Sequence, residues 1–239
     1  ADDVAGGVYI EVTLLAEQPD LDGDGEPDVL PPCGQGEAWL ELPLIEDAFI
    51  VTGPGGQDVC TIDEGDTPWE GPPSALCGDL NFGATPYLWV GGGNNGMAHF
   101  LLRFSYDVPN RENIQVSDAH VAIRAVDFDP MQPLRELAIF LFVPPNNEWQ
   151  AGMSSGGYPT GEDVTYHHRK YPATYWSAGS PLMSIDTEAL GKAYFTGGPA
   201  DQELALDPAW VQGQLGNIDL PNDAFLLTSD VAVPYTTYV

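Results

Sequence analysis

Hydrophobic and polar residues alternate along several short segments of the chain. Residues 7–17 give the clearest example, because one face would carry Val8, Ile10, Val12 and Leu14. A side-chain period of two is that of a β-strand with one buried face. The pattern therefore predicts a half-buried strand near the start of the sequence.

The same pattern recurs in short segments separated by Gly- and Pro-rich stretches, which are typical of turns. Further strands are predicted at 38–45, 47–52, 87–90, 98–106, 119–128 and 137–143. Asp207 followed by Pro208 is typical of a helix start and predicts a short helix ending near Gly216. A weaker helix signal covers 186–194. The predicted fold class is all-β: an antiparallel, jelly-roll-like β-sandwich with one or two short helices and an extra N-terminal strand.

Two parts of unequal size are predicted. Residues 1–43 would form an N-terminal strand followed by an acidic loop. Residues 44–239 would form the β-sandwich domain, interrupted by a long Gly-, Pro- and acid-rich insertion at 53–80.

The charge balance narrows the possible partners. The chain has 36 Asp and Glu against 7 Lys and Arg, a formal net charge of −29. Such a surface repels nucleic acids and anionic membranes, attracts divalent cations and tolerates salt. The longest apolar run, 137–143, is too short to span a bilayer. The sequence opens with Ala1-Asp2-Asp3, typical of a mature N-terminus after signal cleavage, so an extracellular or cell-surface protein is expected.

Three cysteines allow at most one bridge within the chain. Cys60 and Cys77 flank an irregular stretch, and a bridge between them would close a short loop and stabilise the fold by roughly 3 kcal/mol. This pairing is favoured, and Cys33–Cys60 is the alternative. The third thiol would be buried or would pair between chains.

One short loop carries acidic side chains at alternate positions: Asp20, Asp22, Asp24, Glu26 and Asp28. Carboxylates with this spacing converge when a Gly-containing loop curls, and Ca²⁺ takes six to eight oxygen ligands in irregular geometry. Glu26 would contribute its backbone carbonyl. The EF-hand pattern fails because Pro31 stands where the last ligand should be Glu. The loop resembles the calcium loops of thrombospondin type 3 repeats, and a solvated acidic turn is the alternative.

A second candidate site gathers scarce cations with aromatic rings. It comprises Tyr166, His167, His168, Arg169, Lys170 and Trp176. Cations could meet uronates and aromatic faces could stack on sugar rings, which would suit an acidic polysaccharide. The alternative is a structural loop whose cations neutralise neighbouring acids and whose aromatic residues belong to the core.

Several motifs share their order with a known family. They are Glu46–Ile50, Asn81–Gly91, His99–Phe104, Ser117–Val121, Trp149, Glu162–Arg169, Trp176–Gly179, Trp210–Leu215 and Leu220–Leu227. In this order the chain, over roughly 44–239, resembles the DNRLRE-type β-sandwich family, which includes alginate-binding carbohydrate-binding modules. The resemblance implies a β-sandwich and an acidic polysaccharide as ligand.

Two functions are compatible with these features, and neither is catalytic. No nucleophile elbow, zinc-binding helix or phosphate loop occurs in the sequence, so no enzyme activity is expected. The first hypothesis is a calcium-stabilised structural subunit of an extracellular filament, sheath or matrix, assembling through pairing of its N-terminal strand. The alternative is a carbohydrate-binding module for an acidic polysaccharide such as alginate.

Overall fold

The structure is a computed structural model. It describes residues 9–14, 38–52, 77–84, 89–93, 96–108, 114–125, 135–195, 200–217, 223–229 and 237–238. Within these ranges the chain is mostly antiparallel β-sheet with one α-helix, which confirms the predicted all-β, sandwich-like fold.

The strands are β1 (Tyr9–Leu14), β2 (Ala38–Thr52), β3 (Trp89–Gly93), β4 (Gly96–Phe104), β5 (Val116–Ala125), β6 (Arg135–Leu141), β7 (His168–Lys170), β8 (Thr174–Tyr175), β9 (Gly191–Phe195), β10 (Ala200–Ala205), β11 (Ala224–Ser229) and β12 (Thr237–Tyr238). The helical segments are η2 (Cys77–Asp79), η4 (Pro181–Met183) and α1 (Pro208–Gly216). The main sheet has the order β10-β5-β1-β2-β4-β11-β6-β9, with β3 paired to β4 and β12 paired to β3.

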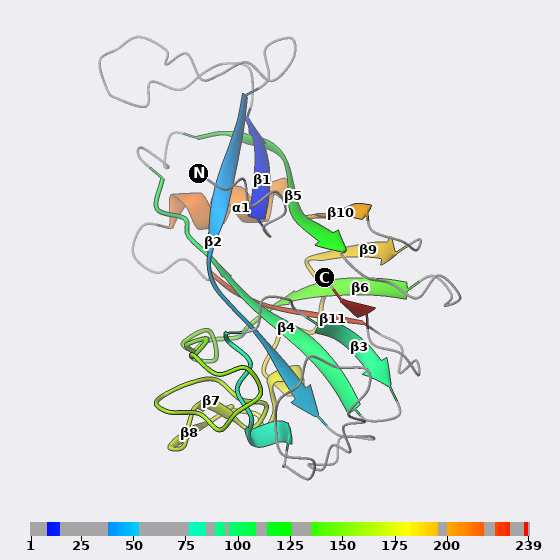
Figure 1. The fold of residues 1–239 in the computed structure, drawn as a ribbon. Helices are drawn as coiled ribbons and strands as arrows, with labels where there is room; N and C mark the ends of the chain where they lie inside the picture. The colour runs from blue at the N-terminus through cyan, green and yellow to red at the C-terminus, as the bar shows by residue number, and fades with distance from the viewer. Residues whose placement is uncertain are drawn as a thin grey trace, which may run out of the picture.

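Strand β2 joins the two halves of this sheet (Figure 1). Its first part, 38–43, pairs with β1, and its second part, 44–52, pairs with β4. The register shifts between Leu44 and Glu46, where a bulge lets the strand bend. The two strands predicted at 38–45 and 47–52 are therefore one long strand. The bend in β2 divides the sheet into a first half (β10-β5-β1-β2) and a second half (β2-β4-β11-β6-β9), and these two halves face each other.

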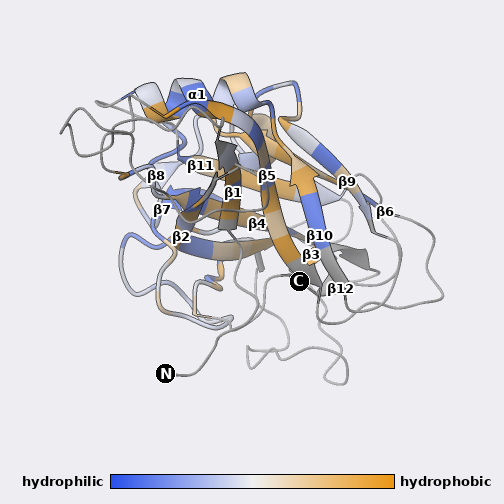
Figure 2. Cartoon of the chain, turned by 90° about the horizontal axis from the view of Figure 1, so that it is seen from above, coloured by the Kyte–Doolittle hydropathy of each residue, from blue (hydrophilic) through white to orange (hydrophobic). Residues whose placement is uncertain are grey.

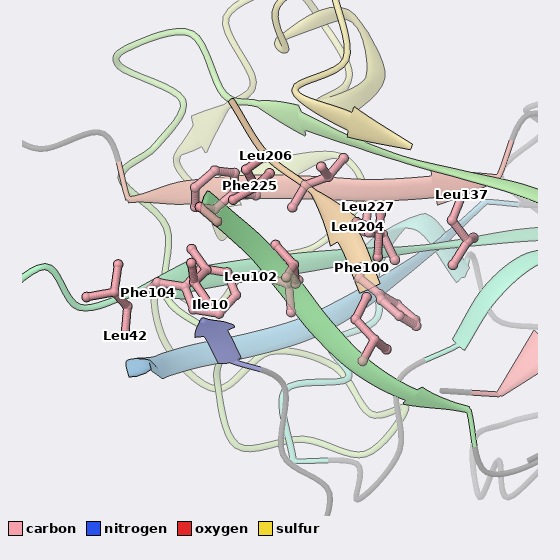
Figure 3. Close-up of a cluster of buried hydrophobic side chains, with 14 of the residues drawn as sticks. Ile10, Leu42, Phe100, Leu102, Phe104, Leu137, Leu204, Leu206, Phe225 and Leu227 are labelled. Atoms are coloured by element: carbon pink, nitrogen blue, oxygen red, sulfur yellow. The ribbon is translucent and has the colours of Figure 1, made fainter. Parts of the chain in front are cut away.

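The inner core fills the space between these halves. Figure 3 shows side chains from both halves pointing toward one another. Among them are Ile10, Leu42, Phe100, Leu102, Phe104, Leu137, Leu204, Phe225 and Leu227, all buried. Figure 2 shows hydrophobic and hydrophilic positions interleaved along strands such as β5 and β10, as expected of strands with one buried face. The predicted alternation of Ile10 and Val12 is confirmed.

A lobe formed mainly by residues 142–190 covers the outer face of the second half. It contains the short β7–β8 hairpin and little other regular structure (Figure 1). Its core is a second hydrophobic cluster that includes Phe142, Trp149, Trp176 and Leu226. Strands β4 and β11 and the end of β2 are thus buried on both faces, with Ile50, Leu101 and Leu226 on the side of the lobe.

The α-helix α1 begins as the sequence predicts. The Asp207 carboxylate accepts a hydrogen bond from the Ala209 N–H at 2.9 Å, and Pro208 is the first helical residue. Val211 and Leu215 face the inner core. The second predicted helix, at 186–194, is wrong. Its last residues belong to β9, where Ala193 packs inward and Lys192 and Tyr194 are exposed, and where pairing with β6 satisfies the backbone.

The N-terminal strand is a central strand and not a spare edge. β1 pairs with β2 along one side and with β5 along the other. Ile10 and Val12 are fully buried in the inner core. β2 also runs without interruption through residues 43–44, where the sequence predicts the start of the sandwich domain. The predicted extra strand therefore has no free edge for pairing with another copy, because both of its edges already have partners within the chain.

Candidate functional site

Two of the sequence-predicted sites lie outside the described residues. These are the acidic loop at 20–28, with its five proposed calcium ligands, and the Cys60–Cys77 bridge, of which only the backbone of Cys77 is described. Among the described residues, no three His, Cys, Asp or Glu side chains are grouped as metal ligands. The calcium site and the disulfide therefore stay predictions.

The predicted aromatic ligand Trp176 lies in the core of the lobe. Only 2% of its surface is exposed, and its ring stacks on Phe142 with centroids 5.1 Å apart. The indole N–H donates to the Thr165 carbonyl at 3.1 Å. Tyr166 is half-buried against the same cluster. Trp176 is thus a structural residue and does not offer its face to a sugar ring.

The two histidines of the patch are tied to Asp79 on η2. His167 Nδ1 lies 2.9 Å from Asp79 Oδ1, and a Cβ added at Gly78 would lie 2.5 Å from the His167 ring. Glycine is therefore needed at position 78 for this approach. His168 is buried, and burial lowers its pKa, an effect that Asp79 opposes and His167 strengthens. These contacts join the patch to the segment around η2.

The same cluster does not form a catalytic relay. The Thr165 hydroxyl and the Asp79 carboxylate both approach Nδ1 of His168, at 3.4 and 3.8 Å. A hydroxyl nucleophile and an orienting carboxylate must bind opposite ring nitrogens for the imidazole to move a proton between them. Thr165 is also fully buried. Thr165 and Asp79 therefore do not form a relay through the His168 ring, and their contacts connect the loop to η2.

The remaining cations of the patch point to different places. The Arg169 guanidinium donates to the Pro145 carbonyl and lies 3.5 Å from the Glu148 carboxylate. Lys170 instead lines an open cleft of about 300 Å³. Its walls are Pro159, Thr160, Gly161, Glu162, Lys170, Tyr171, Pro172, Ala173 and Thr174. The structure therefore divides the six predicted ligand residues, and only Lys170 lines this cleft.

A site not predicted from the sequence is the slot that holds β1. Ile10 lies opposite Leu42 on β2 and Val121 on β5, and all three side chains are buried. On the outer face, Glu11 lies opposite Glu41 and His120. Among the described residues, no other strand lies between β2 and β5, and β1 supplies partners to the facing backbone edges of both.

Sequence reasoning also missed the role of Asn81, which it treated only as part of a family-like motif. Its side-chain amide donates to the carbonyls of Ala151 and Val164, at 2.5 and 2.9 Å. Its carbonyl oxygen accepts from the N–H groups of Gly83 and Ser154, at 3.3 and 3.1 Å. The fully buried side chain thus joins the η2 segment to the lobe. The only available signal was an Asn within a hydrophobic stretch.

Comparison with known proteins leaves the family open. No protein-family model matches the chain, and no curated protein sequence matches it significantly. The resemblance to DNRLRE-type domains therefore stays a prediction. Within the described ranges, no helix has both the length and the apolar character needed to cross a membrane.

Proposed function

We propose that this protein is a non-catalytic structural subunit of an extracellular filament, sheath or matrix, stabilised by calcium and linked to its neighbours through the N-terminal strand. The observation that carries the proposal is the position of β1. β1 lies between β2 and β5 and pairs with both, and in the described structure it is the element that joins these two strands into one sheet. A strand held in this way is the kind of element through which copies of a β-protein associate.

The state of the predicted ligand patch favours this structural role. Trp176 and His168 are buried, His167 is bound to Asp79, and Arg169 is bound to the Pro145 carbonyl. A sugar-binding face needs exposed rings and accessible cations. Most of the patch serves instead to hold the lobe on the sheet.

Calcium enters the proposal through the acidic loop at 20–28. By its place in the sequence, this loop lies in the connection between β1 and β2. Carboxylates gathered in one loop of a chain of net charge −29 repel one another unless a cation offsets them. Calcium bound there would stiffen the connection that determines where β1 can reach.

The test is electron microscopy and sedimentation of the full-length protein in calcium, followed by chelation. We expect assemblies in calcium that shorten or fray when the chelator is added. The double variant Asp22→Asn, Asp24→Asn should weaken assembly, and Glu188→Gln, which removes one exposed charge in the lobe, should not. A protein that stays monomeric at every calcium concentration would refute the proposal.

The cleft beside Lys170 supports a second candidate, binding of an acidic polysaccharide. Lys170 and Glu162 offer charge, Thr160 and Thr174 offer hydroxyls, and Tyr171 offers a ring in one open cavity. Alginate oligosaccharides should bind more weakly to Lys170→Gln than to the wild type. Lys192→Gln is the matched control, since Lys192 pairs with Glu136 on another part of the surface. Absence of binding by the wild-type protein in calcium would exclude this candidate.

A further inference from the structure

We propose that neighbouring copies are linked by exchange of β1, so that the β1 strand of one copy fills the slot between β2 and β5 of the next. This inference rests on the proposed function and names its partner, a second copy of this chain. It also replaces simple edge pairing, because β1 has no free edge in the described structure.

The slot is specific for this strand. β1 pairs at all six of its positions, from Tyr9 to Leu14, with β2 and again with β5. Ile10 and Val12 are fully buried between the halves of the sheet. A one-residue slip would turn these two side chains outward and bring Glu11 into the core, so the slot disfavours a strand shifted by one residue. An identical strand from another copy meets every one of these requirements.

The slot would be incomplete without a strand. If β1 leaves, the facing edges of β2 and β5 lose their hydrogen-bond partners, and the inner core is opened beside Leu42 and Val121. An open slot of this kind is a strong acceptor for an extended segment. Exchange restores the same contacts, so the exchanged and closed forms differ mainly in the connection and in protein concentration.

The length of the connection permits exchange. Antiparallel neighbours such as β1 and β2 can be joined by two to five residues. Here they are joined by residues 15–37, which could span up to about 75 Å when fully extended. A domain of this size is about 45 Å across, estimated from the usual scaling of the radius of gyration. The chain is thus long enough for β1 to reach the slot of an adjoining copy.

Non-reciprocal exchange leads to a filament. If copy one inserts β1 into copy two, copy one keeps an open slot and copy two keeps a β1 strand to donate. Head-to-tail contacts that do not close produce an open chain of subunits. Reciprocal exchange between two copies would instead give a closed dimer.

The pairing register of β1 and β2 allows a disulfide cross-linking test in which the two cysteines are placed in different copies. One full-length variant carries Glu11→Cys on β1, and a second carries Glu41→Cys on β2, its cross-strand neighbour on the outer face. Cross-strand neighbours lie within disulfide distance. In an equimolar mixture, a bond between positions 11 and 41 necessarily joins two copies, and pairing of β1 of one copy with β2 of another brings these positions within reach. Peptide mass spectrometry identifies that bond among those of the native cysteines.

The matched control replaces the second variant with Glu203→Cys. Glu203 is also an outward-facing glutamate of the same half-sheet, but β5 lies between its strand and β1. We expect the 11–41 bond to exceed the 11–203 bond about tenfold or more in mixed assemblies, because two strand spacings exceed the reach of a disulfide.

The outcomes separate the exchange from the proposed function. A third variant carries both Glu11→Cys and Glu41→Cys in one chain. Assemblies without an 11–41 bond between copies, together with an 11–41 bond inside this third variant, would overturn exchange and leave the structural role standing. Bonds between copies that occur only in closed dimers would support exchange and overturn the filament. Monomers that link only within themselves would overturn both.

Discussion

The inner core and the lobe core are held together in different ways. The inner core lies between the two halves of one sheet, and its backbone groups are paired mainly in strand ladders. The lobe core, around Trp149 and Trp176, is covered by mostly irregular segments whose strands are limited to the short β7–β8 hairpin. In these segments, side-chain hydrogen bonds take the place of strand pairing: Asn81, Asn146 and Trp176 all donate to backbone carbonyls.

This difference explains why several polar and aromatic residues of the lobe that resemble ligands in the sequence are bound within the fold, among them Trp176 and His167. An irregular segment must satisfy its backbone with side chains if it is to be buried. Residues suited to that purpose, such as His, Asn and Trp, are also those that bind ligands. In the lobe, such residues satisfy the backbone. The element proposed for assembly, β1, belongs to the inner core instead.

The largest effect is expected at Asn81 in the lobe. Asn81→Leu removes four hydrogen bonds and leaves the carbonyls of Ala151 and Val164 without this partner. Each buried group left unsatisfied costs about 1–3 kcal/mol, so the free energy of unfolding should fall by about 4 kcal/mol. Urea denaturation measures it. The exposed neighbour Gln150→Ala is the control and should change stability by less than about 0.5 kcal/mol. A loss at Asn81 no larger than that of the control would contradict the role given to it.

The inner core is tested at β1. Ile10→Ala should lower the free energy of unfolding by about 3 kcal/mol, because it leaves a cavity in a fully buried site. Glu11→Ala, one residue away on the outer face, should be nearly neutral, because it removes both the repulsion from Glu41 and the contact with His120 Nε2 at 3.7 Å. Equal effects from the two variants in urea denaturation would show that β1 is not seated as described.

Acid should destabilise the face of the sheet that carries His99. Burial lowers the pKa of His99 to about 4 from 6.5, and its Nδ1 lies 2.7 Å from the Thr228 hydroxyl. Below about pH 6.5 His99 becomes protonated in the unfolded chain, whereas in the folded chain it stays neutral until about pH 4. The free energy of unfolding should therefore fall by about 3 kcal/mol between these values and lose nothing more from this group below them. The lowered pKa of His168 acts in the same direction.

Denaturation at a series of pH values checks this prediction. His99→Gln should flatten the dependence between about pH 6.5 and 4, because it removes the titrating group. An unchanged slope in that variant would assign the acid sensitivity to other residues.

A smaller effect separates structural from ligand-binding aromatic residues in the lobe. Trp176→Phe should cost about 2 kcal/mol, because the Thr165 carbonyl loses its donor and the smaller ring leaves a gap beside Phe142. Tyr175→Ala, at a side chain that is 64% exposed, should cost less than about 1 kcal/mol. Thermal unfolding of both variants makes the comparison. If Trp176→Phe were as mild as Tyr175→Ala, the burial of Trp176 would be in doubt.

The regular parts of the fold follow from the sequence, and the lobe does not. Alternation at Ile10 and Val12 and the Asp207-Pro208 helix start are local signals, so they could be read directly. The seating of β1 between β2 and β5 depends on contacts distant in sequence, and alternation alone cannot separate a central strand from an edge strand.

The candidate sites show the same limit. Composition correctly marked residues 166–176 as unusual. It could not show that Trp176 stacks on Phe142 while Lys170 lines a cleft. The direction in which each of these side chains points depends on how the β7–β8 hairpin packs against the rest of the chain, and composition carries no information about that packing. Asn81 was missed because three of its four partners, Ala151, Ser154 and Val164, lie far from it in the sequence.

The most direct test of the central claim is a cryo-EM reconstruction of the full-length protein assembled in calcium. Strand exchange predicts that residues 9–14 lie between β2 and β5 of an adjoining subunit, with residues 15–37 crossing the subunit boundary. The register would be the one described here, with Ile10 opposite Leu42 and Val121. A reconstruction in which every subunit keeps β1 in its own sheet would contradict the claim.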